Sequence, residues 1–429
     1  MRAASILVAM ALSLSAASTA HAGKALVERK PYTVPAYDKL SDRDRYFLPQ
    51  EVHAAVVADT SVTIERIRYK SGKLTVAGFV VKPTKATAKA KLPVVIWCRG
   101  GYGPESVVGD ANVETLADMV TVASAGFVVL MPNYRGADGG EGVDERGGAE
   151  VEDVKALVPV AREIEGADAS RLFIFGVSRG ALDALIAVRE GLPARAIVVT
   201  GPVVNELERP LPAELLRASP PGVDWTTQAA KERRSPIRWA KEITPPILIL
   251  QGGSDRATPP DGALDFARTL EKTGAVYELW VVAGGDHGLT RAYRDGRLAR
   301  TIDWFQHPRT KPLSLVLERA LDEGGIPLAK KRFVEAKKAG PGVIDMGERD
   351  VNTLGYILLN QGKPDHAVAI LEINAQAHPT SANVWDSLGE AHATAGNKPE
   401  AIKAYKKALA LDPKSASAKA ALERLTAKP

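Results

Sequence analysis

Three residues of this sequence have the types and the chain order that acyl transfer by a serine nucleophile requires. Ser178 lies at the centre of the segment GVSRG at 176–180, where an apolar run gives way to a helical pattern. A serine flanked by glycines at such a point is typical of a nucleophile elbow, a sharp turn that exposes a reactive hydroxyl. An ordinary turn with a capping serine has the same pattern, so the rest of the chain must decide between the two interpretations.

A possible acid and a possible base follow Ser178 in the expected order. Serine is a weak nucleophile unless a base takes its proton, and the base needs a carboxylate that holds its tautomer. Asp255 follows an apolar run at 246–251, and His287 follows the next such run at 277–283. Because the chain order serine, acid, histidine is that of the α/β hydrolases, these three residues are the candidate triad.

Competing assignments exist for the histidine and for the acid. Of the seven histidines, His287 is the one that lies on a loop after a predicted strand and after Ser178. Asp286 competes with Asp255 for the role of the acid. Adjacent side chains in a turn rarely face each other, so we expect Asp286 to form the turn and Asp255 to orient the histidine.

The charge that develops on a substrate carbonyl oxygen also needs hydrogen-bond donors. We expect one donor to be the backbone N–H of Arg179, the residue after the serine. The second is expected in the loop RGGYGP at 99–104, whose glycines let the backbone approach a substrate closely. A plain glycine turn is the alternative. The side chains of Arg99 and Arg179 either place positive charge at the pocket mouth, favouring an anionic substrate, or are simply solvated.

The elements that must position these residues indicate an α/β fold. Two predicted strands that contain both polar and apolar residues flank a hairpin turn at 70–73. Apolar runs then alternate with helical patterns. The predicted strands are 62–69, 74–81, 93–98, 126–132, 172–175, 196–204, 246–251 and 277–283. This order predicts the α/β-hydrolase fold, a mixed, mostly parallel sheet with helices on both faces. Sites in such sheets lie at the carboxyl ends of the strands.

The chain changes character after about residue 310 and becomes an all-α, TPR-like helical domain at 313–429. Two segments, 348–381 and 382–415, align at the period of a tetratricopeptide repeat. A helix pair at 314–339 could stack beneath them, and 419–425 belongs to a capping helix. Stacked repeats of this kind bind extended peptides or partner proteins on their concave face. We therefore expect a protein or peptide partner for this domain.

The beginning of the chain reads as a signal peptide. Residues 1–22 combine a charged start, an apolar run at 6–14 and a small-residue cleavage pattern that ends at Ala22. Cleavage before Gly23 would give a periplasmic or secreted protein. Residues 23–60 are expected to form an N-terminal arm, and 61–307 the catalytic domain. No other stretch is apolar and long enough to cross a membrane.

Composition argues against several other function classes. The formal net charge is +5, and no segment concentrates Lys and Arg as nucleic-acid binding requires. The histidines do not pair at metal-ligand spacing, and no glycine-rich phosphate loop follows a strand. We expect no nucleic acid, no metal and no cofactor.

Residues 60–306 resemble the catalytic domain of the prolyl oligopeptidase family of α/β hydrolases. The resemblance rests on five segments: GVSRG at 176–180, NYRG at 133–136, RSPI at 234–237, the run 247–255, and DHGL at 286–289. It implies that Ser178 is the nucleophile, Asp255 the orienting acid and His287 the general base.

The chain also departs from that family. The loop after the first buried strand commonly begins with His or Tyr, and in some members the Tyr hydroxyl serves the oxyanion hole. Arg99 occupies that position here, so we expect the second donor to be the N–H of Gly100. Residues 23–60 are too few for the β-propeller that many members carry before the catalytic domain. The segment 205–235 is a candidate lid.

Three functions remain open from the sequence. The first is a prolyl-oligopeptidase-type serine peptidase for short peptides, and the second is a carboxylesterase on the same scaffold. The third is a binding protein in which the repeats act and the hydrolase core is inert. The complete candidate triad argues against the third. Nothing in the residues separates a peptide substrate from an ester.

Overall fold

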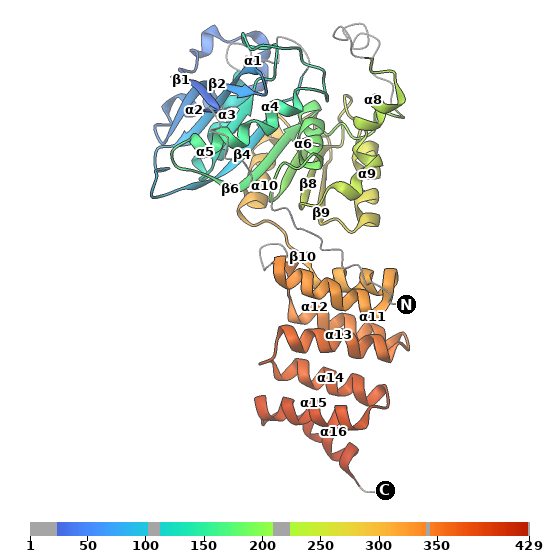
Figure 1. The fold of residues 1–429 in the computed structure, drawn as a ribbon. Coiled ribbons are helices and arrows are strands. Elements are labelled where there is room, and N and C mark those ends of the chain that lie inside the picture. Colours follow the sequence, from blue (N-terminus) through green and yellow to red (C-terminus); the bar gives the residue numbers. More distant parts are fainter. Residues whose placement is uncertain (1–23, 102–111, 209–223, 340–343, 428–429) are drawn as a thin grey trace, which may run out of the picture.

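The computed structural model describes residues 24–101, 112–208, 224–339 and 344–427. An α/β domain and an arm of stacked helices make up this part of the chain, and the arm extends from one end of the α/β domain (Figure 1). Within the described residues, no helix is both long and apolar enough to cross a membrane.

One sheet of nine strands forms the centre of the α/β domain, in the order β1-β2-β3-β5-β4-β6-β7-β8-β9. The strands are β1 Leu26–Pro31, β2 Val62–Ser71, β3 Leu74–Pro83, β4 Leu92–Cys98, β5 Val128–Pro132, β6 Ala167–Val177, β7 Ile197–Thr200, β8 Ile247–Gly252 and β9 Tyr277–Val282. The strands from β1 to β3 pair antiparallel, as does β3 with β5, and the remaining pairs are parallel. The predicted mixed, mostly parallel sheet of an α/β hydrolase is confirmed.

Helices cover both faces of this sheet, because the buried parallel strands are apolar on both sides. One face packs against α4 Val151–Lys155, α5 Leu157–Glu163, α6 Arg179–Arg189 and α9 Pro260–Thr273. The other face packs against α1 Asp42–Phe47, α2 Gln50–Ala58, α3 Val113–Ser124 and α10 Arg294–Gln306. In β4, Val94 and Ile96 point into the first layer, whereas Val95 and Trp97 point into the second.

The structure differs from the expected division at residue 60. Strand β1 pairs with β2 as the edge of the main sheet, and Leu40, Leu48 and Val56 are buried in the core that α3 and α10 also fill. The segment expected as a separate arm is therefore an integral layer of the α/β domain. An edge strand that is mostly exposed needs no apolar face, so its sequence, LVERKP, carries no strand pattern.

The C-terminal arm consists of helix pairs. They are α11 Leu313–Ala339, which kinks at Gly324 and Gly325, then α12 Glu348–Asn360, α13 Pro364–Ala377, α14 Ala382–Thr394, α15 Lys398–Leu411 and a last helix, α16 Ala416–Thr426. Gly355 of α12 packs directly on Leu371, and Gly389 of α14 packs in the same way on Tyr405. The same glycine contact thus occurs in both predicted repeats.

The arm joins the α/β domain at the edge where the parallel strands begin. Short parallel strands β10 Lys311–Pro312 and β11 Ile344–Asp345 mark the junction. Arg319 of α11 donates to the carbonyl oxygens of Glu271 (2.7 Å) and Lys272 (3.5 Å) at the end of α9. A cavity of about 540 Å³ lies at this junction.

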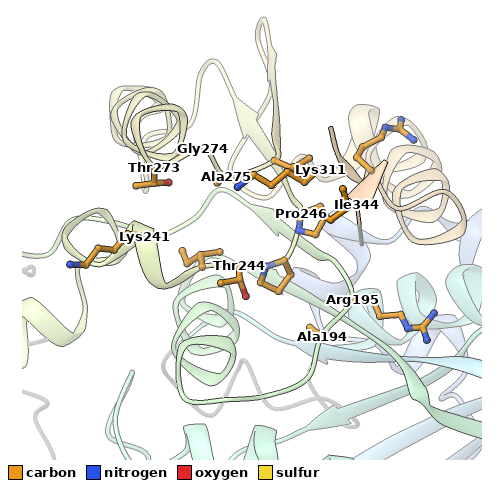
Figure 2. Close-up of a pocket in the computed structure, with 14 residues that line it drawn as sticks. Ala194, Arg195, Lys241, Thr244, Pro246, Thr273, Gly274, Ala275, Lys311 and Ile344 are labelled. Carbon is orange, nitrogen blue, oxygen red and sulfur yellow. The ribbon is translucent and has the colours of Figure 1, made fainter. Parts of the chain in front are cut away.

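Figure 2 shows that cavity, which Lys311 and Ile344 of the arm line together with segments of the α/β domain. Those segments directly precede three strands: Ala194 and Arg195 before β7, Thr244 and Pro246 before β8, and Gly274 and Ala275 before β9. The carboxyl ends of the same strands lie at the opposite edge of the sheet. The arm and the carboxyl ends are therefore on opposite sides of the α/β domain.

Candidate active site

Ser178 occupies a sharp turn between β6 and α6. The strand ends at Val177, the helix begins at Arg179, and Ser178 between them has φ 56° and ψ −123°. This conformation is sparsely populated for a residue with a Cβ, and it persists only where the surroundings enforce it. The Ser178 N–H donates to the carbonyl oxygen of Thr200 at the end of β7 (2.9 Å). The turn has the geometry of a nucleophile elbow.

The two glycines around Ser178 are required by close packing. A Cβ on Gly176 would lie 2.4 Å from the carbonyl oxygen of Gly180, and a Cβ on Gly180 would lie 2.2 Å from that of Cys98. Both distances are far inside van der Waals contact. Glycine at these positions therefore lets the first turn of α6 approach β6 and the end of β4, which forms the elbow.

Asp255 and His287 contact each other at the carboxyl ends of β8 and β9. His287 Nδ1 lies 2.8 Å from Asp255 Oδ2. The other Asp255 oxygen, Oδ1, accepts the N–H groups of Ala257 and Thr258 (2.9 Å each), and Oδ2 also accepts the hydroxyl of Thr258 (2.8 Å). Asp255 is buried, so these donors replace the water that a carboxylate would otherwise bind.

The electrostatics of this pair favour an ionised Asp255. Burial alone would raise its pKa, but the hydrogen bond and charge of His287 and the hydrogen bonds from Thr258 outweigh burial and lower the pKa below the ordinary value. An ionised carboxylate at Nδ1 retains the proton on that nitrogen. Nε2 of His287 is then the nitrogen available as a base.

Asp286 has a different role. Its carboxylate accepts the backbone N–H of Thr290 (2.8 Å) and the hydroxyl of the same residue. Asp286 therefore closes the turn that carries His287, as the sequence analysis expects of it.

The loops that carry Ser178, Asp255 and His287 converge. A Cβ on Gly201, which follows β7, would lie 3.0 Å from Asp255 Oδ2 and 3.2 Å from His287 Nδ1. A Cβ on Gly288 would lie 3.4 Å from a methyl group of Val177, the residue before the serine. The structure thus brings the three predicted residues to one edge of the sheet.

The two expected oxyanion donors also lie at the elbow. Arg179 is the first residue of α6, where backbone N–H groups and the helix dipole favour negative charge. Gly100 packs against the serine, since a Cβ on it would lie 3.1 Å from Ser178 Cβ. Residues 102–111 of the following loop, and 209–223 of the candidate lid, lie outside the described residues.

Both interpretations of the Arg99 and Arg179 side chains are wrong. The two side chains are buried beneath the elbow and reach neither a pocket mouth nor bulk solvent. Arg179 Nη1 donates to both oxygens of Asp144 (2.6 and 2.7 Å). Arg99 donates to the carbonyl oxygens of Asn133 (2.8 Å) and Gly100 (3.0 Å). Arg179 is thus paired with a carboxylate and Arg99 with main-chain carbonyl oxygens, and neither buried guanidinium is presented to a substrate.

From the sequence, no role is assigned to Thr258, or to Tyr134 within the NYRG segment. Thr258 Oγ1 bonds Asp255 and also the carbonyl oxygen of Gly201 (3.0 Å), and it lies 3.3 Å from His287 Nδ1. Its position three residues after an aspartate in a loop is typical of a local Asx-type turn, and that spacing could have identified it. Tyr134 follows β5 with φ 62°, and no sequence signal predicts that. Within the described ranges, no group of three or more His, Cys, Asp and Glu side chains could hold a metal ion.

Each of the two parts of the chain contains a segment that matches the sequence model of a known family. Residues 114–310 match the sequence model of the prolyl oligopeptidase family of serine peptidases. The chain carries a prolyl oligopeptidase family domain. Residues 382–415 match the tetratricopeptide repeat, which coincides with the second predicted repeat.

Relatives of the prolyl oligopeptidase family domain include an uncharacterized peptidase, YtmA, of Bacillus subtilis. It is 24% identical over 231 residues, which are 53% of this chain and 86% of that protein. The acylamino-acid-releasing enzyme of Sus scrofa is 26% identical over 244 residues, but this chain covers only 32% of its length. A Pyrococcus horikoshii acylaminoacyl peptidase superposes with a TM-score of 0.50 at 20% identity, over 59% of this chain and 43% of that one, which supports the fold.

Proposed function

We propose that this protein is a serine peptidase that cleaves short peptides through an acyl-enzyme intermediate on Ser178. The observation that carries the proposal is the hydrogen bond between buried Asp255 and His287, 2.8 Å long, on loops that meet the strained turn of Ser178. Serine nucleophiles need this arrangement of base and orienting acid.

The proposed reaction uses each residue in one role. Ser178 Oγ attacks the peptide carbonyl carbon while His287 Nε2 takes the hydroxyl proton, and Asp255 stabilises the imidazolium. The tetrahedral oxyanion accepts hydrogen bonds from the N–H groups of Arg179 and Gly100. His287 then donates the proton to the leaving amine, and a water molecule, activated by the same nitrogen, hydrolyses the ester on Ser178.

We infer that N-acylated short peptides are the first substrates to test. The support is the printed name of the Sus scrofa relative, an acylamino-acid-releasing enzyme. The match covers 32% of that enzyme's length, so a preference for N-acylated substrates is part of the proposal for this chain. A carboxylesterase would use the same chemistry on an ester, since both reactions proceed through an acyl-serine.

Turnover of three matched substrates tests the proposal. Purified protein is assayed with an N-acetyl-aminoacyl nitroanilide, the same nitroanilide with a free amine, and a short-chain nitrophenyl ester. We expect amide turnover, and a preference for the acylated amide supports the inferred class. Ester turnover alone would identify a carboxylesterase, and no turnover of any substrate would favour the binding protein with an inert core.

Labelling identifies the nucleophile. We expect Ser178→Ala to abolish covalent reaction with a fluorophosphonate and to lower kcat by about six orders of magnitude, since the members of a triad act as a unit. Ser254→Ala is the matched control, because Ser254 is an exposed serine next to Asp255 without a role in the proposed mechanism. Retained labelling in Ser178→Ala would contradict the assignment.

Two further expectations concern the rest of the chain. We propose export with cleavage before Gly23, supported by the residue pattern at 1–22. Mass spectrometry of the protein from a periplasmic or culture fraction should give an N-terminus at or near Gly23, and an intact Met1 in the cytoplasm would contradict it. We also propose that the arm binds a protein or peptide partner, as tetratricopeptide repeats support.

A further inference from the structure

Tyr134 lies beneath the elbow with its hydroxyl on the oxyanion loop. It follows β5 in the NYRG segment, is fully buried, and holds the left-handed conformation noted above. The Tyr134 hydroxyl donates to the carbonyl oxygen of Arg99 (3.1 Å), and it also lies next to the buried carboxylate of Asp183 and the thiol of Cys98. A bulky residue in a left-handed conformation is costly, so the position of this ring is maintained by its surroundings.

Two guanidinium groups hold the ring. The guanidinium carbon of Arg179 lies 4.4 Å from the ring centroid, and that of Arg99 lies 4.8 Å from it. Arg179 is in turn held by Asp144. These contacts fix the ring independently of its hydroxyl, because cation–π attraction acts on the ring face.

The hydroxyl contacts the carbonyl oxygen of the peptide that joins Arg99 to Gly100. A peptide bond is planar, and in its usual trans form the carbonyl oxygen and the N–H point in opposite directions. The carbonyl oxygen of Arg99 points at the buried Tyr134 hydroxyl. The N–H of Gly100 therefore points away from that hydroxyl. The next carbonyl, that of Gly100 itself, is held by the Arg99 side chain.

The same hydrogen bond strengthens the donor. An acceptor carbonyl that receives a hydrogen bond is polarised, and its peptide N–H becomes a better donor in turn. Tyr134 thus acts on one expected oxyanion donor through its hydroxyl, and it contacts the side chain of the other, Arg179, through its ring.

We propose that Tyr134 is a positioning residue for the oxyanion hole, which orients and polarises the Gly100 N–H through the Arg99 carbonyl. This inference rests on the proposed function and deepens it. Tyr134 does not touch the substrate. Its effect is therefore expected on the transition state, where the oxyanion forms, and not on binding of the uncharged ground state.

The test is Tyr134→Phe, which removes the hydroxyl and keeps the ring between the two guanidinium groups. We expect kcat to fall roughly tenfold, about the worth of one hydrogen bond, with KM nearly unchanged. A peptide aldehyde forms a hemiacetal with a serine and so carries the oxyanion, and its affinity should fall by the same factor. The affinity of the matching peptide alcohol, which carries none, should not change.

Tyr69→Phe is the matched control. Tyr69 is also fully buried, and its hydroxyl donates to a main-chain carbonyl, that of Asp153 (3.0 Å), away from the oxyanion loop. Both variants lose a buried hydrogen bond to a main-chain carbonyl oxygen, so both should have a lower thermal unfolding midpoint. Only Tyr134→Phe should lose aldehyde affinity.

Equal kinetics and equal aldehyde affinity in the two variants would overturn the inference while leaving the proposed function intact. Failure of the wild-type protein to label at Ser178 would instead overturn the proposed function itself. Should Tyr134→Phe fold poorly, Arg99→Met serves as the second variant. It removes the guanidinium that lies over the Tyr134 ring and bonds the Gly100 carbonyl oxygen, which loosens the ring against the oxyanion loop, and it should lower the affinity for the aldehyde but not for the alcohol. A wild-type affinity for the aldehyde in Arg99→Met would count against the inference.

Discussion

The carboxylate of Asp255 is surrounded by donors, and His287 Nδ1 is one of them at 2.8 Å. Asp286, which precedes His287 in the sequence, instead accepts a hydrogen bond from Thr290 in its own turn. This contrast provides a pair of matched variants.

We expect Asp255→Asn to lower kcat about ten-thousandfold, because an amide stabilises the wrong tautomer of the histidine and cannot balance the imidazolium. Asp286→Asn should cost far less, since it perturbs only a turn. Steady-state kinetics on a nitroanilide, with circular dichroism to verify folding, makes the comparison. A larger loss in Asp286→Asn would reverse the assignment of the acid.

The contribution of the Asp255 carboxylate to folding stability should decrease at acid pH. The folded-state pKa of Asp255 is lowered relative to the ordinary value, so its stabilising contribution is complete above the unfolded-state pKa, about 3.9. That contribution is lost as pH falls through the folded-state pKa. The difference in thermal midpoint between wild type and Asp255→Asn should therefore shrink as pH falls below about 4. A difference that stays constant down to pH 3 would contradict the shift.

Thr258 should matter for the orientation of the acid. Thr258→Val removes the hydroxyl that bonds Asp255 and the Gly201 carbonyl oxygen and nearly preserves the volume. We expect kcat to fall about tenfold, in line with the loss of a partly buried hydrogen bond to an ionised carboxylate, with KM less affected. Thr258→Ser keeps a hydroxyl and should restore most of the activity. If serine rescues nothing, the methyl group and not the hydroxyl supports the site.

The arm should be dispensable for the chemistry. A Cβ on Gly274 would lie 2.1 Å from the guanidinium carbon of Arg319, so Gly274→Ala should displace that side chain and loosen the arm, and at φ 68° it should also strain the end of α9. We expect faster proteolysis at the junction near residue 310 and unchanged turnover of a small ester. A folded chain that ends near residue 310 should keep the same turnover.

Inactivity of that folded, shortened chain would mean that the arm contributes to the active site. The structure argues against this, because the arm contacts the segments that precede β7, β8 and β9, whereas Ser178, Asp255 and His287 follow strands. Arg319→Ala is a milder variant and should behave like Gly274→Ala.

The features that could be predicted from the sequence are those in which buried side chains leave a regular pattern of apolar residues. The parallel strands are buried on both faces and therefore read as continuous apolar runs, so the fold and the edge that carries Ser178, Asp255 and His287 were accessible from the residues. The repeats were accessible because each must pack on the next with a constant period.

The remaining features depend on contacts that leave no local pattern. Strand β1 is an exposed edge, and Glu28, Arg29 and Lys30 carry no sign of it. The direction of the Arg179 side chain depends on Asp144, 35 residues away in the chain. The left-handed Tyr134 is stabilised by two arginines from other strand ends. Charged residues hid the edge strand, and sequence separation hid the two contacts of the arginines.

Helix α16 lies at the far tip of the arm (Figure 1), and the arm contacts the segments that precede β7, β8 and β9, whereas Ser178, Asp255 and His287 follow strands. A tag, a resin linkage or a fused reporter at this end would leave the substrate side open to solution. Immobilised protein should therefore keep its specific activity, which makes C-terminal capture a suitable format for screening peptide libraries.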